Sequence, residues 1–237
     1  MLKKYLFYHR LSALSFSGDF ALDHPFYQPG IKVSLFKEKA YQVTKRAMDL
    51  VISVTMLPVI VPILLLCVVA IKLDSPGPAF FLQTRTGRGG RPFKIIKLRT
   101  MVKNAAELRD QYLHLNELTL PDFKITNDPR VTRVGRILRK LSLDEMPQIF
   151  NVLRGEMTLV GPRPSSYDAT TYRLWHTVRF ELKPGITGLA QICGRSELHL
   201  DEKLRYDIAY LRKQSLGLDI RILLRTMITA FNGHGAK

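Results

Sequence analysis

The sequence predicts a mostly α-helical protein with a small β element, held at a membrane from one side by a re-entrant helix-break-helix hairpin and amphipathic surface helices. This monotopic arrangement follows from three observations. No charged residue occurs among the 22 positions from Leu50 to Ile71, two prolines lie in the middle of that run, and basic residues flank it on both sides. As a helix the run is about 33 Å long, enough to cross the hydrocarbon core of a bilayer.

Three segments are expected along the chain. Residues 1–36 mix aromatic and polar residues with Pro and Gly and are interpreted as an irregular N-terminal arm. Residues 37–73 hold a basic approach helix and the apolar hairpin, which ends at the Pro- and Gly-containing stretch LDSPGP. Residues 74–237 form the third segment, a domain on one face of the membrane.

Pro58 and Pro62 decide how the apolar run is interpreted. Each proline removes a backbone donor and collides with the preceding turn, so a strong bend is expected. Lys and Arg are typical of cytoplasmic flanks, and here both flanks carry them, which favours a run that returns to the side it came from. A single bent transmembrane helix and a hairpin buried in a soluble core are the alternatives.

Short elements are expected in the third segment. One or two strands surround a glycine-rich turn at Gly87–Gly90, and residues 102–118 carry apolar residues at helical spacing. Two helices joined near Ser142 follow, and helices at about 201–214 and 217–231 end the chain. The last helix has an apolar stripe that suits either the protein core or a membrane surface. The stripe consists of Ile220, Leu223, Leu224, Met227, Ile228 and Phe231.

The charge balance restricts the class of partner. The chain has 36 Lys and Arg against 20 Asp and Glu, a net charge of +16, which predicts an anionic partner such as nucleic acid, anionic lipid or a phosphorylated substrate. Cys67 lies inside the apolar run and Cys193 outside it, so no disulfide is expected, in keeping with a reducing compartment. The six His show no spacing typical of a zinc site.

An acidic pair, Asp144 and Glu145, stands out in this basic chain. One interpretation is a capping box, with Ser142 as the N-cap and Glu145 returning a hydrogen bond three residues later. The other is catalytic, and the two are compatible. A carboxylate in the first turn of a helix is stabilised in its ionised form by the helix dipole, and a carboxylate nucleophile must be ionised.

A carboxylate that attacks a phosphoryl group needs cations around the transferring oxygens, either basic side chains or Mg²⁺. Candidates lie near rigid Gly and Pro turns and beside the acidic pair. Each alone is typical of a solvated surface charge, but their density favours a phosphate site. They are Lys97 and Arg99 in KLRTM, Arg139 before the pair, and Arg163 in GPRP.

Several motifs occur in a fixed order along the chain. They are KLDSPGPAFFLQTRTG, FKIIKLRTM, TNDPRVTRVGRILRKLSLDEMPQIFNVLRGEMTLVGPRP and KPGITGLAQICGR. In this order they resemble the bacterial sugar transferase family, the monotopic phosphoglycosyl transferases that begin lipid-linked glycan assembly. The resemblance covers about residues 40–232.

The resemblance implies transfer of a sugar 1-phosphate from a UDP-sugar to undecaprenyl (polyprenyl) phosphate, with release of UMP. It implies Mg²⁺ as the cofactor. This is the first membrane step of exopolysaccharide, capsule or O-antigen synthesis, and glucose or galactose is the expected sugar. It also implies a bacterial inner (cytoplasmic) membrane location with the catalytic domain, residues 74–237, on the cytoplasmic face. Membrane lipid is then a partner, nucleic acid is not, and a homodimer contact through residues 1–36 is open.

The resemblance also assigns roles to residues. Asp144 is implied as the nucleophile that forms a covalent aspartyl-phosphosugar intermediate, and Glu145 as a residue associated with Mg²⁺ and the acceptor step. The four basic residues are implied to hold phosphates. The family's apolar segment breaks at a Ser-Pro pair whose proline matches Pro62, but Val61 stands here in place of the Ser, so either Pro62 or Pro58 could make the main bend.

Two rival functions are distinguishable. A membrane-associated glycosyltransferase would release UDP instead of UMP. A non-catalytic basic protein would bind anionic lipid or nucleic acid with strong salt dependence and without need of Asp144 or Glu145. The ordered motifs, including GPRP, have no purpose in that second rival.

Overall fold

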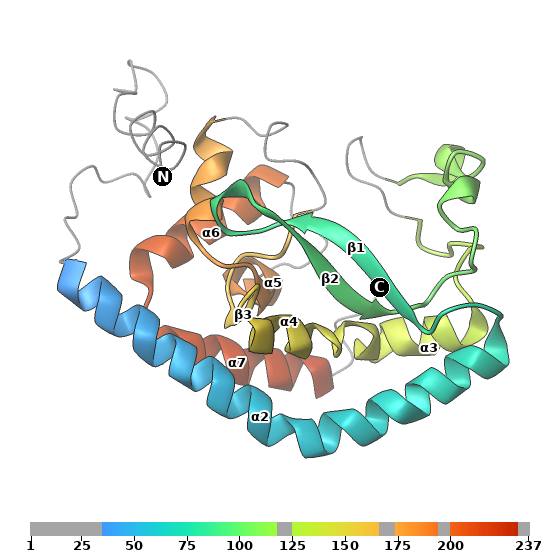
Figure 1. Ribbon diagram of the computed structural model, residues 1–237. Helices are drawn as coiled ribbons and strands as arrows, with labels where there is room; N and C mark the ends of the chain where they lie inside the picture. Colours follow the sequence, from blue (N-terminus) through green and yellow to red (C-terminus); the bar gives the residue numbers. More distant parts are fainter. Residues whose placement is uncertain (1–34, 118–124, 166–173, 194–199, 232–237) are drawn as a thin grey trace. The chain divides into compact units, whose positions relative to one another are not determined.

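The computed structural model describes residues 35–117, 125–165, 174–193 and 200–231 (Figure 1). The chain divides into two compact units, Met1–Glu38 and Lys39–Lys237, and nearly all described residues belong to the second. The predicted N-terminal arm, residues 1–36, lies almost wholly outside the described residues. Its role and the predicted segment boundary at residue 74 stay predictions.

Helices dominate the described residues, which confirms the predicted mostly α-helical class with a small β element. The helices are α2 (Leu35–Asp74), α3 (Arg133–Lys140), α4 (Gln148–Arg154), α5 (Leu189–Cys193), α6 (Leu200–Lys213) and α7 (Leu216–Phe231). The strands are β1 (Phe80–Thr86), β2 (Pro92–Leu98), β3 (Thr158–Val160) and β4 (Gly185–Thr187). Short 3-10 helices lie at η1 (Arg88–Gly90), η2 (Glu107–Arg109), η3 (Leu113–Leu115), η4 (Leu143–Glu145) and η6 (Leu174–Glu181).

The apolar run lies inside one continuous helix, α2, which contains both Pro58 and Pro62. The predicted break is therefore a bend. Figure 1 shows α2 bent in its middle, so that both of its ends lie on the same side of the bend. Two missing backbone donors weaken one side of a helix enough to bend it without ending it.

The Thr55 hydroxyl, one turn before Pro58, does not bond the carbonyl that this proline leaves without a donor. Its Oγ1 donates to the carbonyls of Val51 and Ile52, at 2.7 and 3.0 Å. The carbonyl that loses its donor to Pro58 is that of Val54, four residues earlier. Threonine back-bonding of this kind itself favours helix bending, so Thr55 adds to the effect of the prolines.

The N-terminal half of α2 is fixed to the rest of the chain by two charged side chains. Arg46 donates to the carbonyls of Val152 and Leu153, at 2.6 and 2.9 Å, and so places a cation at the C-terminal end of α4. The carboxylate of Asp49, which is 2% exposed, accepts from Thr158 Oγ1 at 2.6 Å. Its second oxygen accepts from the Leu159 amide at 3.2 Å.

The other end of α2 is fixed as well. The Asp74 carboxylate accepts from the amide of Val134, at 3.0 Å, in the first turn of α3. Contacts on both sides of the apolar run, through Arg46 and Asp74, therefore join α2 to the rest of the unit Lys39–Lys237.

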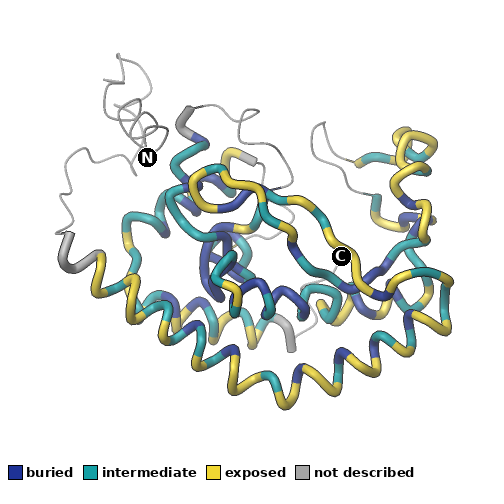
Figure 2. Tube along the Cα trace, viewed as in Figure 1, coloured by how far each residue is buried: buried dark blue, intermediate teal, exposed yellow. Residues whose placement is uncertain are grey.

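Many apolar residues of α2 are exposed, as the colouring of the helix in Figure 2 shows. A stripe at helical spacing is buried and joins the core: Ile60, Leu64, Cys67 and Ile71. The exposed large apolar residues of the helix are Val43, Val51, Val54, Met56, Val59, Val61, Leu65, Leu66, Val69 and Leu73. Among the described residues, only Lys39–Asp74 is long and apolar enough to be a candidate membrane segment.

Two shorter helices also carry exposed apolar residues. At α3 these are Ile137, within the helix, and Leu141, which directly follows it. On α7 most of the predicted stripe is exposed, at Ile220, Leu224, Met227 and Ile228, while Ile222 is fully buried. The stripe was predicted to pack in the protein core or to lie on a membrane surface. Its exposed residues do not pack in the core.

The β1–β2 hairpin confirms the strands predicted around the glycine-rich turn. Its two strands are antiparallel with Phe81 opposite Lys97. Gly89 and Gly90 have φ of 68° and 73°, a left-handed backbone that glycine adopts without steric cost. The second sheet pairs β3 with β4 in parallel.

The helix predicted over residues 102–118 is wrong. The described part of this stretch, up to residue 117, consists of turns and the two 3-10 helices η2 and η3. A competing donor explains this locally, because Arg130 Nη1 donates to the carbonyl of Ala105 at 3.2 Å. The Arg109 amide, which an α-helix would direct to that carbonyl, bonds Ala106 instead.

The buried carboxylate of Asp49 allows a test of how α2 is held. Asp49→Ala leaves the Thr158 hydroxyl and the Leu159 amide buried without acceptors, so we expect the free energy of unfolding to fall by about 2–3 kcal/mol. Thermal unfolding in detergent measures the change. Asp110→Ala, which removes an exposed carboxylate, is the matched control and should leave the free energy of unfolding within about 0.5 kcal/mol of wild type.

Candidate functional site

The acidic pair lies on the short 3-10 helix η4, just after the chain reverses at the end of α3. Ser142 makes this reversal with φ of 56°, the left-handed region. An N-cap residue needs an extended backbone, and Ser142 makes no side-chain cap here, so the predicted capping box is wrong. The pair also precedes α4, which begins at Gln148, rather than lying in its first turn.

Glu145 is clamped by two cations from distant parts of the chain. Lys97 Nζ, at the end of β2, lies 2.8 Å from Oε1, and Arg163 Nη2 lies 2.5 Å from the same oxygen. Arg163 Nη1 also donates to Oε2 at 3.3 Å. Burial by itself raises the pKa of Glu145, but the charges of Arg163 and Lys97 outweigh it and hold the pKa well below its usual range.

Asp144 is in a different situation from its neighbour. Its carboxylate accepts no hydrogen bond from the described residues and is only partly buried. Three cations act on it through their charge alone: Lys97, Arg139 and Arg163. Of the two adjacent carboxylates, Asp144 is thus the one whose oxygens accept no hydrogen bond from the described residues.

The pKa of Asp144 is raised from its ordinary value. Burial is the main cause and the charge of Glu145 adds to it, while the three cations oppose both. The sequence argument that a helix dipole favours the ionised form is therefore wrong for this residue. Because η4 is only three residues long, Asp144 lies outside a regular helix. It also lies beside a second carboxylate, that of Glu145.

Asn151 on α4 holds the pair in register with Lys97. Its side chain is fully buried and accepts from the Ile96 amide at 3.0 Å, while its Nδ2 donates to the Lys94 carbonyl at 2.8 Å. These bonds fix α4, and with it η4, against β2. The sequence analysis missed Asn151. A polar side chain between the apolar residues Phe150 and Val152 of a short helix is the signal that could have found it.

Arg139 reaches the site from the last turn of α3. Its Nε donates to Thr100 Oγ1 at 2.9 Å, which directs the guanidinium toward the chain beyond β2. The close approach of α3 to this chain depends on Gly135, because a Cβ there would lie 2.1 Å from the Thr100 carbonyl oxygen. Thr132 caps the helix by accepting from the Gly135 amide.

Arg163 reaches the site from the GPRP turn that follows β3, as the sequence predicted. Its backbone carbonyl accepts from Arg179 Nη2 at 2.6 Å, and Arg179 in turn pairs with the buried Asp207 of α6 at 3.0 Å. Burial raises the pKa of Asp207 to about 6, against the opposing charge of Arg179. These two residues, which the sequence analysis also missed, hold the turn in place.

Arg99 has other partners than the remaining predicted residues. It is buried, and its guanidinium donates to the carbonyls of Pro76 and Ser75, at 2.6 and 2.7 Å, and to the Ser75 hydroxyl. It therefore supports the turn that follows α2. Of the predicted set, the structure gathers Lys97, Arg139 and Arg163 around the pair, whereas the bonds of Arg99 go to this turn.

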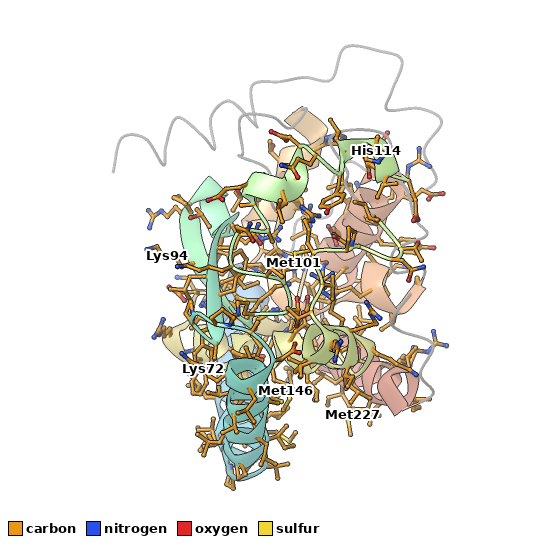
Figure 3. The ribbon with its side chains drawn as sticks, turned by 90° about the vertical axis from the view of Figure 1, so that its right-hand side faces the viewer. Lys72, Lys94, Met101, His114, Met146 and Met227 are labelled. Carbon is orange, nitrogen blue, oxygen red and sulfur yellow. The ribbon has the colours of Figure 1, made fainter. Side chains whose placement is uncertain are left out.

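The site lies toward the end of the unit that carries α2 and α7. Figure 3 shows Met146, the residue after the pair, at about the height of Lys72 near the end of α2 and of Met227 on α7. His114 lies at the opposite end in the same view. The acidic pair is thus close in height to the exposed apolar residues of the helices.

The donor set determines whether Mg²⁺ could be held here. Among the described residues, no group of three or more His, Cys, Asp and Glu side chains comes together. Mg²⁺ is commonly held by one or two carboxylates together with substrate phosphates. Asp144 and Glu145 supply two carboxylates, and Asp144 has free lone pairs, so the pair fits an ion that binds with a diphosphate but forms no dedicated metal cage.

The fold and the site together define a class: a helical protein with one long apolar helix, exposed apolar surfaces, and a carboxylate pair surrounded by three basic side chains. The sequence profile described as bacterial sugar transferase matches residues 40–233. The chain belongs to the bacterial sugar transferase family.

Several relatives carry more specific names. One from Aeromonas hydrophila, 38% identical over 86% of this chain and 47% of its own length, is a UDP-N-acetylgalactosamine-undecaprenyl-phosphate N-acetylgalactosaminephosphotransferase. One from Caulobacter vibrioides, 44% identical over 79% of this chain and 70% of its own, is a UDP-glucose:undecaprenyl-phosphate glucose-1-phosphate transferase. One from Salmonella typhimurium, 39% identical over 81% of this chain and 41% of its own, is an undecaprenyl-phosphate galactose phosphotransferase.

The chain spans about half the length of several of these curated relatives. The part that is matched includes the acidic pair, the surrounding cations and α2 from residue 40 onward.

The opposite pKa shifts of the pair predict opposite effects on stability. A raised carboxyl pKa means that ionisation disfavours the folded state, so Asp144→Asn should unfold at the same or a higher temperature at pH 7. A lowered pKa contributes stability that is present above the ordinary pKa and lost as pH falls through the folded value, so Glu145→Gln should unfold at a lower temperature. Calorimetry at pH 7 compares the two, and equal destabilisation would contradict the described asymmetry.

Proposed function

We propose that this protein transfers a sugar 1-phosphate from a UDP-sugar to undecaprenyl (polyprenyl) phosphate and releases UMP, with Asp144 as a covalent nucleophile. The observation that carries the proposal is the asymmetry of the pair, in which Glu145 is held by two cations while Asp144 has no hydrogen bond from the described residues. The names of the three relatives described above, each an undecaprenyl-phosphate sugar phosphotransferase, support the substrate classes.

In the first step an oxygen of the Asp144 carboxylate attacks the phosphorus that is bonded to the sugar. The bond from that phosphorus to the oxygen bridging the two phosphates breaks, and UMP leaves with that oxygen. In the second step a phosphate oxygen of the lipid acceptor attacks the same phosphorus. The bond to Asp144 breaks, which regenerates the carboxylate and leaves a diphosphate link between sugar and lipid.

The three cations are placed to stabilise both steps. Attack by a carboxylate on a phosphoryl group brings two negative charges together, and Lys97, Arg139 and Arg163 all act on Asp144 through their charge. Mg²⁺, held by Asp144 or Glu145 together with the diphosphate, would add to the neutralisation of the phosphate oxygens. Arg99, by supporting the turn after α2, contributes to the site's framework in this proposal.

The contacts at both ends of α2 support a helix that enters the membrane and returns. If this part of α2 were a straight helix, the roughly 25 residue-to-residue steps from Asp49 to Asp74 would extend about 38 Å. Asp49 and Asp74 would then lie on opposite sides of a bilayer. Yet Asp49 contacts β3 and Asp74 contacts α3 within one compact unit. The exposed apolar residues of α3 and α7 would lie at the membrane surface beside it.

In this proposal the membrane is the bacterial inner membrane and the catalytic unit faces the cytoplasm, where UDP-sugars are made. Exopolysaccharide, capsule or O-antigen synthesis would use the product. The names of the relatives divide between glucose, galactose and N-acetylgalactosamine, so they support a hexose phosphate as the class of transferred group.

Loss of the nucleophile is the direct test. We expect Asp144→Asn to reduce turnover of UDP-sugar and undecaprenyl phosphate by at least about 10³-fold, because an amide cannot form the phosphosugar adduct. Turnover is followed as UMP release across a panel of UDP-sugars. Wild-type protein incubated with donor alone should carry a sugar-phosphate adduct on Asp144, detectable by mass spectrometry.

The controls separate this proposal from its rivals. Asp110→Asn, at an exposed position, should retain wild-type turnover. Full turnover by Asp144→Asn would refute the nucleophile, and UDP in place of UMP would indicate a direct glycosyltransferase. Activity that persists undiminished in EDTA would argue against Mg²⁺ as the cofactor.

A labelling experiment tests the path of α2. In a protein without its native cysteines, Val43→Cys and Lys94→Cys place exposed thiols on either side of the apolar run. If α2 returns to its starting side, a membrane-impermeant maleimide should react with both thiols to the same extent in inside-out vesicles and with neither in intact spheroplasts. Reaction of one thiol in each preparation would indicate a crossing helix.

A further inference from the structure

The start of β1 exposes three consecutive apolar side chains. Phe80, Phe81 and Leu82 are 44, 48 and 55% exposed. Successive side chains of a strand point to opposite faces, so both faces of the strand are apolar here. An exposed apolar strand of this kind is a liability in water and commonly marks a binding surface. The proposed reaction, as described so far, makes no use of it.

The edge of β1 is covered at one end and open at the other. At its far end, the Thr86 amide donates to the Ser165 carbonyl at 3.1 Å. Near Phe80 the strand has β2 on one side, and the sheet contains no third strand within the described residues. The open part of the edge therefore coincides with the three apolar residues.

The register of the hairpin connects this surface to the acidic pair. Phe81 lies opposite Lys97, and side chains directly opposite each other in an antiparallel pair lie on the same face about 5 Å apart. Lys97 Nζ is 2.8 Å from Glu145 Oε1. A half-exposed aromatic ring thus stands beside the cation that contacts the pair.

An apolar surface that begins next to a phosphate-binding cation fits a molecule with both characters. The acceptor of the proposed reaction has a phosphate that must reach Asp144 and an isoprenoid chain that starts directly at that phosphate. Its first isoprene units must then lie within a few ångströms of the cations. A second copy of this chain or a membrane acyl chain would give no reason for the apolar surface to begin opposite Lys97.

We infer that Phe80, Phe81 and Leu82 bind the first isoprene units of the lipid acceptor, with Phe81 nearest the phosphate. The inference rests on the proposed function and specifies one binding surface for it. Figure 1 shows β1 beginning close to the end of α2, where Leu73 is 84% exposed, so the remainder of the isoprenoid chain can pass from β1 toward the apolar helix.

The two half-reactions allow a selective test. Phe81→Gln should raise the KM for undecaprenyl phosphate about tenfold, since a polar side chain gives up the burial of roughly half a phenyl ring. UMP release and adduct formation with donor alone should stay at the wild-type rate, because that step involves no lipid. Phe81→Leu, which keeps an apolar side chain, should retain most of the acceptor affinity.

Leu113→Gln is the matched control. Leu113 is 42% exposed and neighbours His114, which lies at the opposite end of the unit from Met146 in Figure 3. This variant should keep the wild-type KM for the acceptor. If wild-type protein forms the adduct but Phe81→Gln shows an unchanged KM for the acceptor, the inference is wrong while the proposed function stands. A loss of vesicle binding or of oligomerisation in Phe81→Gln without a change in that KM would likewise overturn it in favour of a membrane or protein contact. Absence of any adduct in wild type would refute the proposed function itself.

Discussion

The clamp on Glu145 is the interaction on which the site depends. Two adjacent carboxylates in a partly buried place repel each other, and each would be costly to keep ionised alone. Lys97 and Arg163 solve this for one of them by direct contact, from the end of β2 and from the turn after β3. The clamp also joins β2 and the turn after β3 to η4. The same two ion pairs therefore keep Glu145 ionised and hold the parts of the site together.

The surrounding fold keeps that clamp in register. Asn151 bonds the backbone of β2 and so fixes the distance between Lys97 and the pair, while Arg179 holds the carbonyl of Arg163. Asp49 before the apolar run of α2 and Asp74 after it bond β3 and α3. Helix α2 is therefore bonded to α3, which carries Arg139, and to β3, which leads into the turn that carries Arg163. The depth of α2 in a membrane would in this way set the height of the acidic pair above the hydrocarbon.

The sequence was most informative about the site where residues of suitable chemistry occur in the ordered motifs. The acidic pair, Lys97, Arg139 and Arg163 could be chosen because an anionic nucleophile needs cations, and the structure brings these five together. Arg99 has the same chemistry, but its use depends on a turn 24 residues earlier in the chain, which no local pattern announces. The helix predicted over 102–118 failed for a similar reason, since a distant guanidinium takes a carbonyl that the helix needs. Ser142 matched the capping pattern, yet its backbone turns left-handed where the chain must reverse. Local spacing predicted elements and chemistry, whereas long-range hydrogen bonds decided which of them were realised.

The resting charge balance also indicates which cation is free to respond to a substrate. The Arg163 side chain is 53% exposed, whereas that of Lys97, on β2, is 17% exposed. An exposed guanidinium exchanges a carboxylate for a phosphate at little desolvation cost, because water already reaches it, and its planar fork matches either anion. Lys97 can meanwhile keep Glu145 ionised. In the proposed reaction, a turn of Arg163 toward the incoming diphosphate would take one of the two partners from Glu145. The carboxylate oxygen freed in this way would be available to a metal ion bound with the diphosphate. In this proposal Arg163 could therefore move from Glu145 to the substrate while Lys97 continued to compensate the charge of the pair.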